Sequence, residues 1–141
     1  MANLTIAAGT QPFTKTAERP VSRKAGEGLN TPIMPLYFKA SDSKVYRADS
    51  STADTEKNTV IGISVSISET DQYVYTVADK GSIIDWGASL TKGTTWYLTG
   101  LGTIGEYTDV SIGDALVQLG HTDDNQDFIV DILHFNQTKS A

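Results

Sequence analysis

The chain contains no cysteine among its 141 residues. It therefore has neither a disulfide framework nor a thiolate metal site, and a secreted fold that depends on disulfides is disfavoured. A domain of this length buries roughly two thirds of the surface that its unfolded chain would expose. We therefore expect a sizeable core that is held by packing or by neighbouring chains.

Long apolar runs are lacking as well. No stretch approaches the run of about 20 apolar residues that spans a bilayer. The N-terminus has neither the basic start nor the apolar core of a signal peptide. The sequence therefore predicts a soluble protein that is made in the cytoplasm and has no membrane partner.

Basic charge is scarce outside the first 28 residues. The net charge is −6, yet residues 1–28 carry four basic and two acidic side chains, whereas the remainder carries seven basic and fifteen acidic ones. A basic segment thus precedes an acidic body. Because phosphate binding needs a basic surface whose counterions can be released, the acidic body argues against nucleic acid as a partner.

The basic segment, residues 1–28, is predicted to be an extended N-terminal arm that precedes a β domain at residues 29–141. It has little periodicity, and Pro12 and Pro20 interrupt any regular element. Residues 4–6 have weak strand character, and such an arm often becomes ordered by adding to the edge of another chain's sheet. A disordered, solvated tail is the alternative.

Short strand patterns fill the rest of the chain. Residues 87–99 are a turn-rich entry followed by the apolar run Trp96, Tyr97 and Leu98, which favours a half-buried strand. Residues 60–67 alternate between apolar residues and glycine or serine, so one face is predicted to be core. The opposite face, with Ser64, Ser66 and Ser68, is predicted to be wet or to contact another protein.

Other strand candidates follow at spacings of about ten residues. They are residues 36–38, 45–48, 73–78, 82–85, 115–119 and 128–135, of which the first two and the last two are predicted to form hairpins. Residues 49–59 are predicted to be a polar loop or one helical turn, and residues 100–105 a flexible loop or small hairpin outside the core. With no long helix expected, the fold class is all-β, a small β-sandwich or barrel with an extended N-terminal arm.

Five segments carry a recognisable order along the chain. They are KVYRA at 44–48, VIGI at 60–63, Gly81 with its short strand, GASLTKGTTWYL at 87–98 and GDALVQLG at 113–120. This order resembles small β-rich bacteriophage virion proteins, the capsid decoration (cement) proteins and the related base domains of head and tail fibres. The resemblance extends over residues 26–133.

The resemblance implies a homotrimer on the outside of an icosahedral head, where it clamps neighbouring subunits of the major capsid protein. The arm is the predicted capsid contact, through strand addition and basic side chains. The residues expected to make this contact are Leu4, Thr5, Ile6, Lys15, Arg19, Arg23 and Lys24. The protein is then located on the outer capsid surface of the virion.

Two alternatives to decoration stay open. One is a base or anchor domain of a head or tail fibre. The other is a carbohydrate-binding module on the virion surface, which requires an aromatic platform for sugar rings. The side chains predicted for such a platform are Trp86, Trp96, Tyr73, Tyr75 and Tyr97.

Catalytic signatures are absent from the sequence. Residues 62–66 miss the Gly-x-Ser-x-Gly elbow because position 66 is serine, and they lie within a strand pattern. Only His121 and His134 are suited to act as a base near neutral pH. Each lies at or near an end of the closing hairpin, where we expect a surface or interface role. The sequence therefore predicts a protein that is not an enzyme.

One acidic run imitates a metal loop. Asp123, Asn125 and Asp127 copy the first three ligand positions of a calcium loop. The sixth position is Phe128 instead of glycine, and the twelfth is His134 instead of glutamate, so the sharp turn and the bidentate ligand are missing. Residues 123–127 are therefore predicted to be a hairpin turn, with no metal or cofactor.

Overall fold

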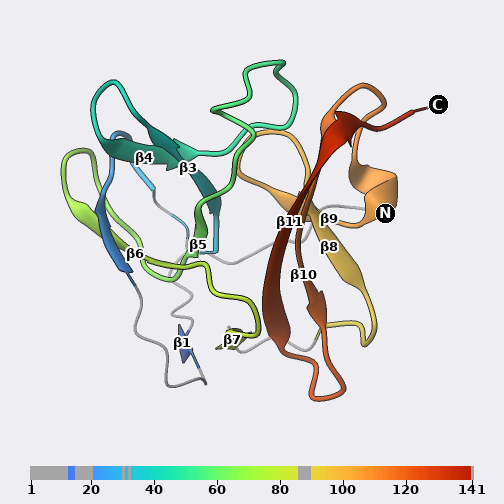
Figure 1. Ribbon diagram of the computed structural model, residues 1–141. Helices are drawn as coiled ribbons and strands as arrows, with labels where there is room; N and C mark the ends of the chain where they lie inside the picture. The colour runs from blue at the N-terminus through green and yellow to red at the C-terminus, as the bar shows by residue number, and fades with distance from the viewer. Residues whose placement is uncertain (1–12, 15–20, 30, 32, 86–89, 141) are drawn as a thin grey trace.

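Two antiparallel β-sheets pack face to face in the computed structural model, which describes residues 13–14, 21–29, 31, 33–85 and 90–140 (Figure 1). The predicted all-β class is confirmed. The one helical element in these ranges is a 3₁₀ turn, η1 (Tyr107–Asp109). No helix among these residues is long and apolar enough to cross a membrane.

Eleven strands form the two sheets. In the six-stranded sheet the order is β1 (Phe13–Thr14), β7 (Ile83–Asp85), β11 (Phe128–Thr138), β10 (Ala115–Thr122), β8 (Thr95–Leu98) and β9 (Ile104–Gly105). In the five-stranded sheet it is β2 (Val21–Lys24), β6 (Tyr73–Val77), β5 (Gly62–Ser64), β3 (Pro35–Lys39) and β4 (Lys44–Arg47). Figure 1 shows β8, β9, β10 and β11 of the first sheet on the right, β1 and β7 below, and the second sheet on the left.

The five-stranded sheet curls so that the chain just after β2 reaches β4. Ala25 forms a parallel bridge with Val45, and the Gly26 N–H donates to the Val45 carbonyl at 2.9 Å. The curl encloses a small apolar cluster. Its buried members are Ala25, Leu29, Met34, Leu36, Val45 and Val74, with Phe38 and Ile61 packed against them.

A larger core fills the space between the sheets. The outer face of the curled sheet and its adjoining loops contribute Ile33, Tyr37, Ala48, Val60, Ile63, Val65 and Val77. The six-stranded sheet and its loops contribute Ile84, Leu90, Trp96, Leu98, Ile104, Val117, Leu119, Phe128 and Val130. Strands β3 and β5 of the curled sheet are therefore covered on both faces, one by the interior of the curl and one by the second sheet, whereas β6 leaves Tyr73 and Tyr75 exposed.

An ion pair secures the closure of the curl. The Arg47 backbone N–H donates to Glu27 Oε2 at 3.0 Å, and the guanidinium Nη2 donates to Oε1 at 2.8 Å. Gly102 lies against the stem of this arginine, since a Cβ there would stand 2.9 Å from Arg47 Cγ. Glu27 thus ties the segment after β2 to both the backbone and the side chain of β4.

Replacing Glu27 by glutamine is expected to lower the free energy of unfolding by about 1–2 kcal/mol. Hydrogen bonds to charged groups contribute roughly 1.5–3 kcal/mol each, and partial exposure reduces that contribution here. Urea unfolding of the purified chain measures the change. Asp71→Asn, which breaks an exposed ion pair, is the matched control and should leave the midpoint nearly unchanged. An equal loss of unfolding free energy in both variants would contradict a role of Glu27 in closing the curl.

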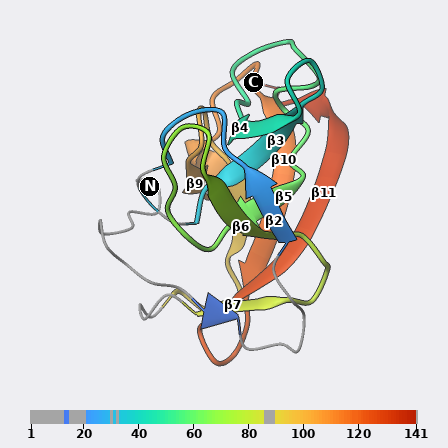
Figure 2. The same cartoon turned by 90° about the vertical axis from the view of Figure 1, so that its left-hand side faces the viewer.

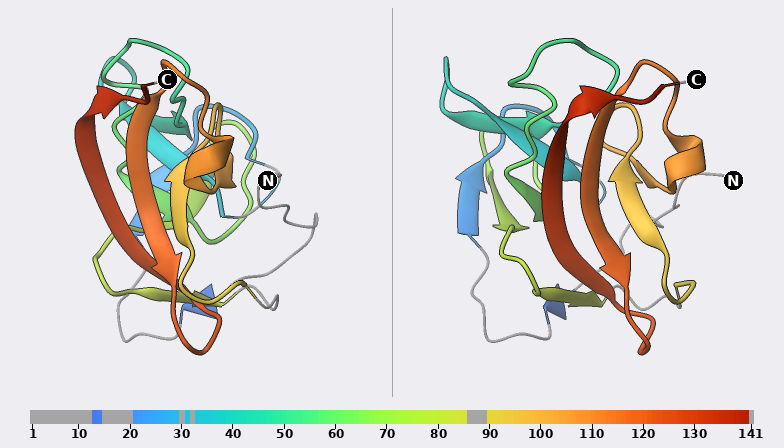
Figure 3. Two further views of the ribbon diagram at one scale, coloured as in Figure 1. Left: turned by 90° about the vertical axis from the view of Figure 1, so that its right-hand side faces the viewer. Right: turned by 45° about the vertical axis from the view of Figure 1, so that its right-hand side comes forward.

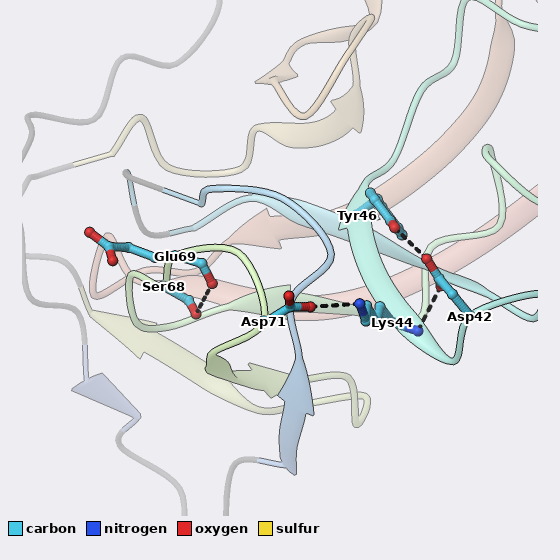
Figure 4. A network of polar contacts seen from close by, with 6 residues as sticks. All are labelled: Asp42, Lys44, Tyr46, Ser68, Glu69 and Asp71. Atoms are coloured by element: carbon cyan, nitrogen blue, oxygen red, sulfur yellow. Dashed lines mark hydrogen bonds and ion pairs between the residues drawn. The ribbon is translucent and has the colours of Figure 1, made fainter.

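The control pair belongs to an exposed polar network around the β3–β4 hairpin (Figure 4). Lys44 Nζ lies 2.6 Å from Asp71 Oδ1, and this lysine holds the pKa of Asp71 below its usual value. The Tyr46 hydroxyl donates to Asp42, which raises the pKa of Tyr46 to about 12. Because solvent screens such exposed contacts, they position the hairpin and contribute little to stability.

Both predicted hairpins are confirmed. β3 and β4 pair from Leu36 with Arg47 to Lys39 with Lys44. β10 and β11 form the closing hairpin and extend further than predicted, to Thr122 and Thr138 respectively. The polar segment 49–59 forms turns without a helix.

Two other predictions are wrong. Residues 100–105 were expected outside the core, but β9 pairs with β8 and Ile104 is buried. The predicted wet serine face does not form, because Ser64 and Ser68 are buried. β5 is an inner strand of its sheet, between β6 and β3, and all three of its residues are buried, so both sides of its alternation are enclosed. Ser64 Oγ is satisfied there by the Met34 backbone N–H at 2.8 Å.

Candidate functional site

The predicted arm is only partly described. Leu4, Thr5, Ile6, Lys15 and Arg19 lie outside the described residues. The remaining two predicted contact residues, Arg23 and Lys24, lie on β2, which pairs with β6 of the same chain. Residues 21–24 therefore add to this chain's own sheet, as the strand that pairs with β6.

Arg23 and Lys24 have different surroundings. The Arg23 guanidinium carbon lies 5.9 Å from the centroid of the Phe38 ring, which packs against the cluster inside the curl. Lys24 is exposed and stands opposite Tyr73 across the strand pair. Of the two, Lys24 is thus the one available to a partner.

An exposed aromatic surface lies beside Lys24. Tyr73 and Tyr75 are 65% and 53% exposed on β6, and Ile67, just before the turn into β6, is 48% exposed. Figure 2 shows β2 and β6 together at the surface of the molecule. We call Lys24, Ile67, Tyr73 and Tyr75 the tyrosine patch. Tyrosine and other aromatic side chains are enriched in protein interfaces, so this patch is a candidate docking surface.

The backbone under the patch is held firmly. The Val65 N–H donates to the Tyr75 carbonyl at 2.9 Å, and the Tyr75 N–H donates to Ser66 Oγ at 3.0 Å. β2 completes the sheet on the other side, with Ser22 opposite Tyr75. The two tyrosines therefore project from a rigid strand, which lowers the entropy cost of binding through them.

The predicted aromatic platform for sugars does not form among its described members. Trp96 is buried in the core between the sheets, where its Nε1–H donates to Thr122 Oγ1 at 2.8 Å. Tyr97 lies on the six-stranded sheet and meets the Tyr107 ring edge-on, with centroids 5.7 Å apart. Tyr73 and Tyr75 belong to the other sheet. The fifth member, Trp86, lies outside the described residues.

The two histidines are both on the closing hairpin, and His134 has a defined partner. Its Nε2 accepts a hydrogen bond from the Val60 N–H at 3.0 Å, so the neutral ring carries its proton on Nδ1. Burial lowers the pKa of His134. Protonation of Nε2 would also place an N–H there opposite the Val60 N–H, so this hydrogen bond would be lost.

Acidification below about pH 6.5 is therefore expected to destabilise the fold. The unfolded chain takes up a proton at His134 near pH 6.5, whereas the folded chain resists protonation until a lower pH, so the free energy of unfolding decreases over this window. Thermal unfolding between pH 7 and pH 5 measures the effect. His134→Gln should flatten the pH dependence relative to the unchanged chain. A pH dependence in His134→Gln as steep as that of the unchanged chain would contradict this assignment.

The acidic run 123–127 is the predicted hairpin turn. Asp123 Oδ1 accepts the backbone N–H groups of Asn125 and Asp127, each at 3.0 Å. Gln126 has a positive φ of 64° within the turn. Within the ranges that the structure describes, no three His, Cys, Asp or Glu side chains lie together as a group able to hold a metal ion.

Comparison of the chain with protein-family models, with curated proteins and with solved structures found no match. The class that the described residues define is thus a two-sheet β fold with an exposed tyrosine patch. The resemblance to bacteriophage decoration proteins stays a prediction.

Proposed function

We propose that the chain is a capsid decoration (cement) protein. In this proposal it is a non-enzymatic homotrimer that binds the outer surface of an assembled bacteriophage head and bridges neighbouring major capsid subunits. The observation that supports it most is the tyrosine patch: three large apolar or aromatic side chains exposed next to Lys24, at the point where the arm joins the domain.

A bridging protein needs an adhesive surface larger than one patch. A standard interface buries about 1,600 Å² in total, shared between the partners. Val21, the first residue of β2, is itself 52% exposed and follows directly after arm residues 15–20 in the sequence. The arm runs directly into β2, the strand that pairs with β6 and carries Lys24, and we propose that the arm and the tyrosine patch engage the same capsid surface.

Co-sedimentation with heads that lack decoration protein tests the proposal. The purified chain is mixed with genome-free heads, and the bound fraction is measured as the chain concentration rises. Saturable binding, together with heads that withstand higher temperature, is the expected result. A chain that stays in the supernatant at every concentration would refute the proposal.

Deleting residues 1–12 is expected to weaken head binding at least about tenfold while leaving the fold intact, because the strand-forming segment at Leu4–Ile6 is lost. The cut is placed at residue 12 since a cut at residue 28 removes β2, Ala25 and Glu27 from the curled sheet. A Gly/Ser segment of equal length in place of residues 1–12 is the control. If both variants bind heads as tightly as the unchanged chain, residues 1–12 of the arm do not contact the capsid.

A further inference from the structure

A groove lies between loop 51–59 and the far end of the β10–β11 hairpin. Figure 3 shows the loop, in green, beside the red end of β11. Its volume is about 760 Å³, within the range of ligand sites in proteins. The lining residues come from the loop (Ser51, Thr52, Ala53, Thr55, Asn58, Thr59) and from the hairpin and its approach (Gly113, Ala115, Leu116, Val117, His134, Asn136, Gln137, Thr138). We call it the polar groove.

The lining of the polar groove is uncharged. No Asp, Glu, Lys or Arg is among the lining residues, although 20% of the chain is charged. Eight of the fourteen lining side chains carry a hydroxyl or an amide, and their methyl and methylene groups, with Ala115, Leu116 and Val117, give the groove an apolar surface between these polar groups. A site without charge offsets less of the desolvation of an ionic ligand than of a neutral one, so it favours a neutral, hydrogen-bonding ligand.

One wall of the groove is fixed before any ligand arrives. Asp49 Oδ1 accepts the Ser51 backbone N–H at 2.9 Å, and Asn58 Nδ2 donates to the Thr52 carbonyl at 3.3 Å. The loop is thus held by its own side chains. Such preorganisation lowers the entropy cost of binding.

The other wall offers hydrogen-bonding groups that are not otherwise used. The side chains of Asn136, Gln137 and Thr138 form no hydrogen bond with any residue that the structure describes. His134 contributes a neutral ring, since the Val60 N–H occupies its Nε2 and leaves an Nδ1–H donor. Together these neighbouring residues of β11 offer the groove uncharged hydrogen-bond donors and acceptors.

We propose that the polar groove binds a neutral oligosaccharide. Each sugar hydroxyl both donates and accepts, which matches alternating amide and hydroxyl side chains. An extended peptide fits less well, because β-strand addition takes place along a strand edge, whereas this groove lies over the face of the hairpin, where Val117 and His134 are register partners. Here the lining comes from both strands of the hairpin, Ala115 and Val117 on β10 and His134 and Asn136 on β11.

The groove has no aromatic wall, since its lining includes no Trp, Tyr or Phe. Stacking of a sugar ring therefore contributes nothing, and one site is expected to bind with a dissociation constant on the order of 1 mM. Display of many copies would raise the apparent affinity by 10²-fold or more through avidity, on the order expected for linked sites. This inference is independent of head binding and goes beyond the proposed function.

Saturation-transfer NMR with the full chain tests the inference. The probes are maltotriose, lactose, tri-N-acetylchitotriose and mannotriose as neutral sugars, with 3′-sialyllactose as a charged one and a Thr- and Asn-rich octapeptide as a competitor. Saturation of at least one neutral sugar, with no competition from the peptide, is the expected result. If none of the four neutral sugars shows saturation transfer, or if the peptide displaces a bound sugar, the inference is overturned.

Two variants with matched controls locate the site. Ala53→Trp fills the groove from an exposed position and should weaken sugar binding at least tenfold, whereas Ala78→Trp, exposed elsewhere, should not. Gln137→Ala should weaken it severalfold, and Gln72→Ala should leave it unchanged. Urea unfolding checks that all four variants fold. Unaltered binding by folded Ala53→Trp would place the sugar elsewhere and overturn the assignment.

Discussion

Replacing Gly120 by alanine is expected to cost about 4 kcal/mol of stability and to leave little folded chain at 37 °C. A Cβ at this position would lie 2.8 Å from Phe128 Cε1 and closer still to the Ile129 carbonyl oxygen. Gly120 pairs with Val130 on one side and with Trp96 on the other, so its neighbours are core residues of adjacent strands. None of them is able to move without disturbing the core.

Expression in the soluble fraction and urea unfolding measure this loss. Gly28→Ala is the matched control, because nothing lies within 4 Å of a Cβ built there and its φ is not in the left-handed region. It should change stability by no more than about 0.5 kcal/mol. A Gly120→Ala chain as stable as this control would mean that β10 and β11 do not pack as described.

The double replacement Tyr73→Ser and Tyr75→Ser is expected to weaken head binding about 100-fold, or roughly 2.7 kcal/mol. Both side chains are more than half exposed, so their removal should leave the unfolding midpoint nearly unchanged. The effect on binding and the lack of an effect on stability distinguish an interface role from a structural one. Titration of heads with the labelled variant measures it.

The control for this variant lies on the other sheet. Leu133 and Phe135 are exposed apolar side chains of β11, at 48% and 39%. Leu133→Ser with Phe135→Ser removes comparable apolar surface from a different part of the molecule and should bind heads normally. If this control loses binding while the tyrosine variant retains it, the docking face is β11 and the tyrosine patch has no role.

The hairpins could be predicted from local sequence signals alone. Turn residues such as those at 41–43 and 123–127 separate runs of strand-forming residues, and both turns appear where they were expected. Local chemistry also accounts for Asp123, whose carboxylate caps its own turn. Such features depend only on residues close together in the chain.

Burial could not be predicted in the same way, because it depends on how the strands associate. The alternation at residues 60–67 placed Ile63 and Val65 correctly in the core between the sheets, but Ile61 packs against the other cluster, Ile67 is exposed and Ser64 is buried. These outcomes follow from the way the sheet curls around one core and packs against another. In β6 Tyr73 and Tyr75 face solvent while Val74 and Thr76 are buried, although both alternating sets contain residues able to form a core face. No period-two pattern reveals which face is which.

The candidate binding surfaces depend on still longer distances along the chain. The polar groove joins loop 51–59 to residues 134–138. The tyrosine patch joins β2 to β6, about fifty positions apart in register. Since none of these segments carries a motif of its own, only the pairing of strands brings their side chains together.

A cryo-EM reconstruction of heads incubated with the purified chain tests whether the chain docks on the capsid through the tyrosine patch. Added density is expected at boundaries between major capsid subunits, with β6 and the residues before β2 facing the shell. Heads without added density, or a domain bound to the shell through β10 and β11 with Tyr73 and Tyr75 facing solvent, would contradict it.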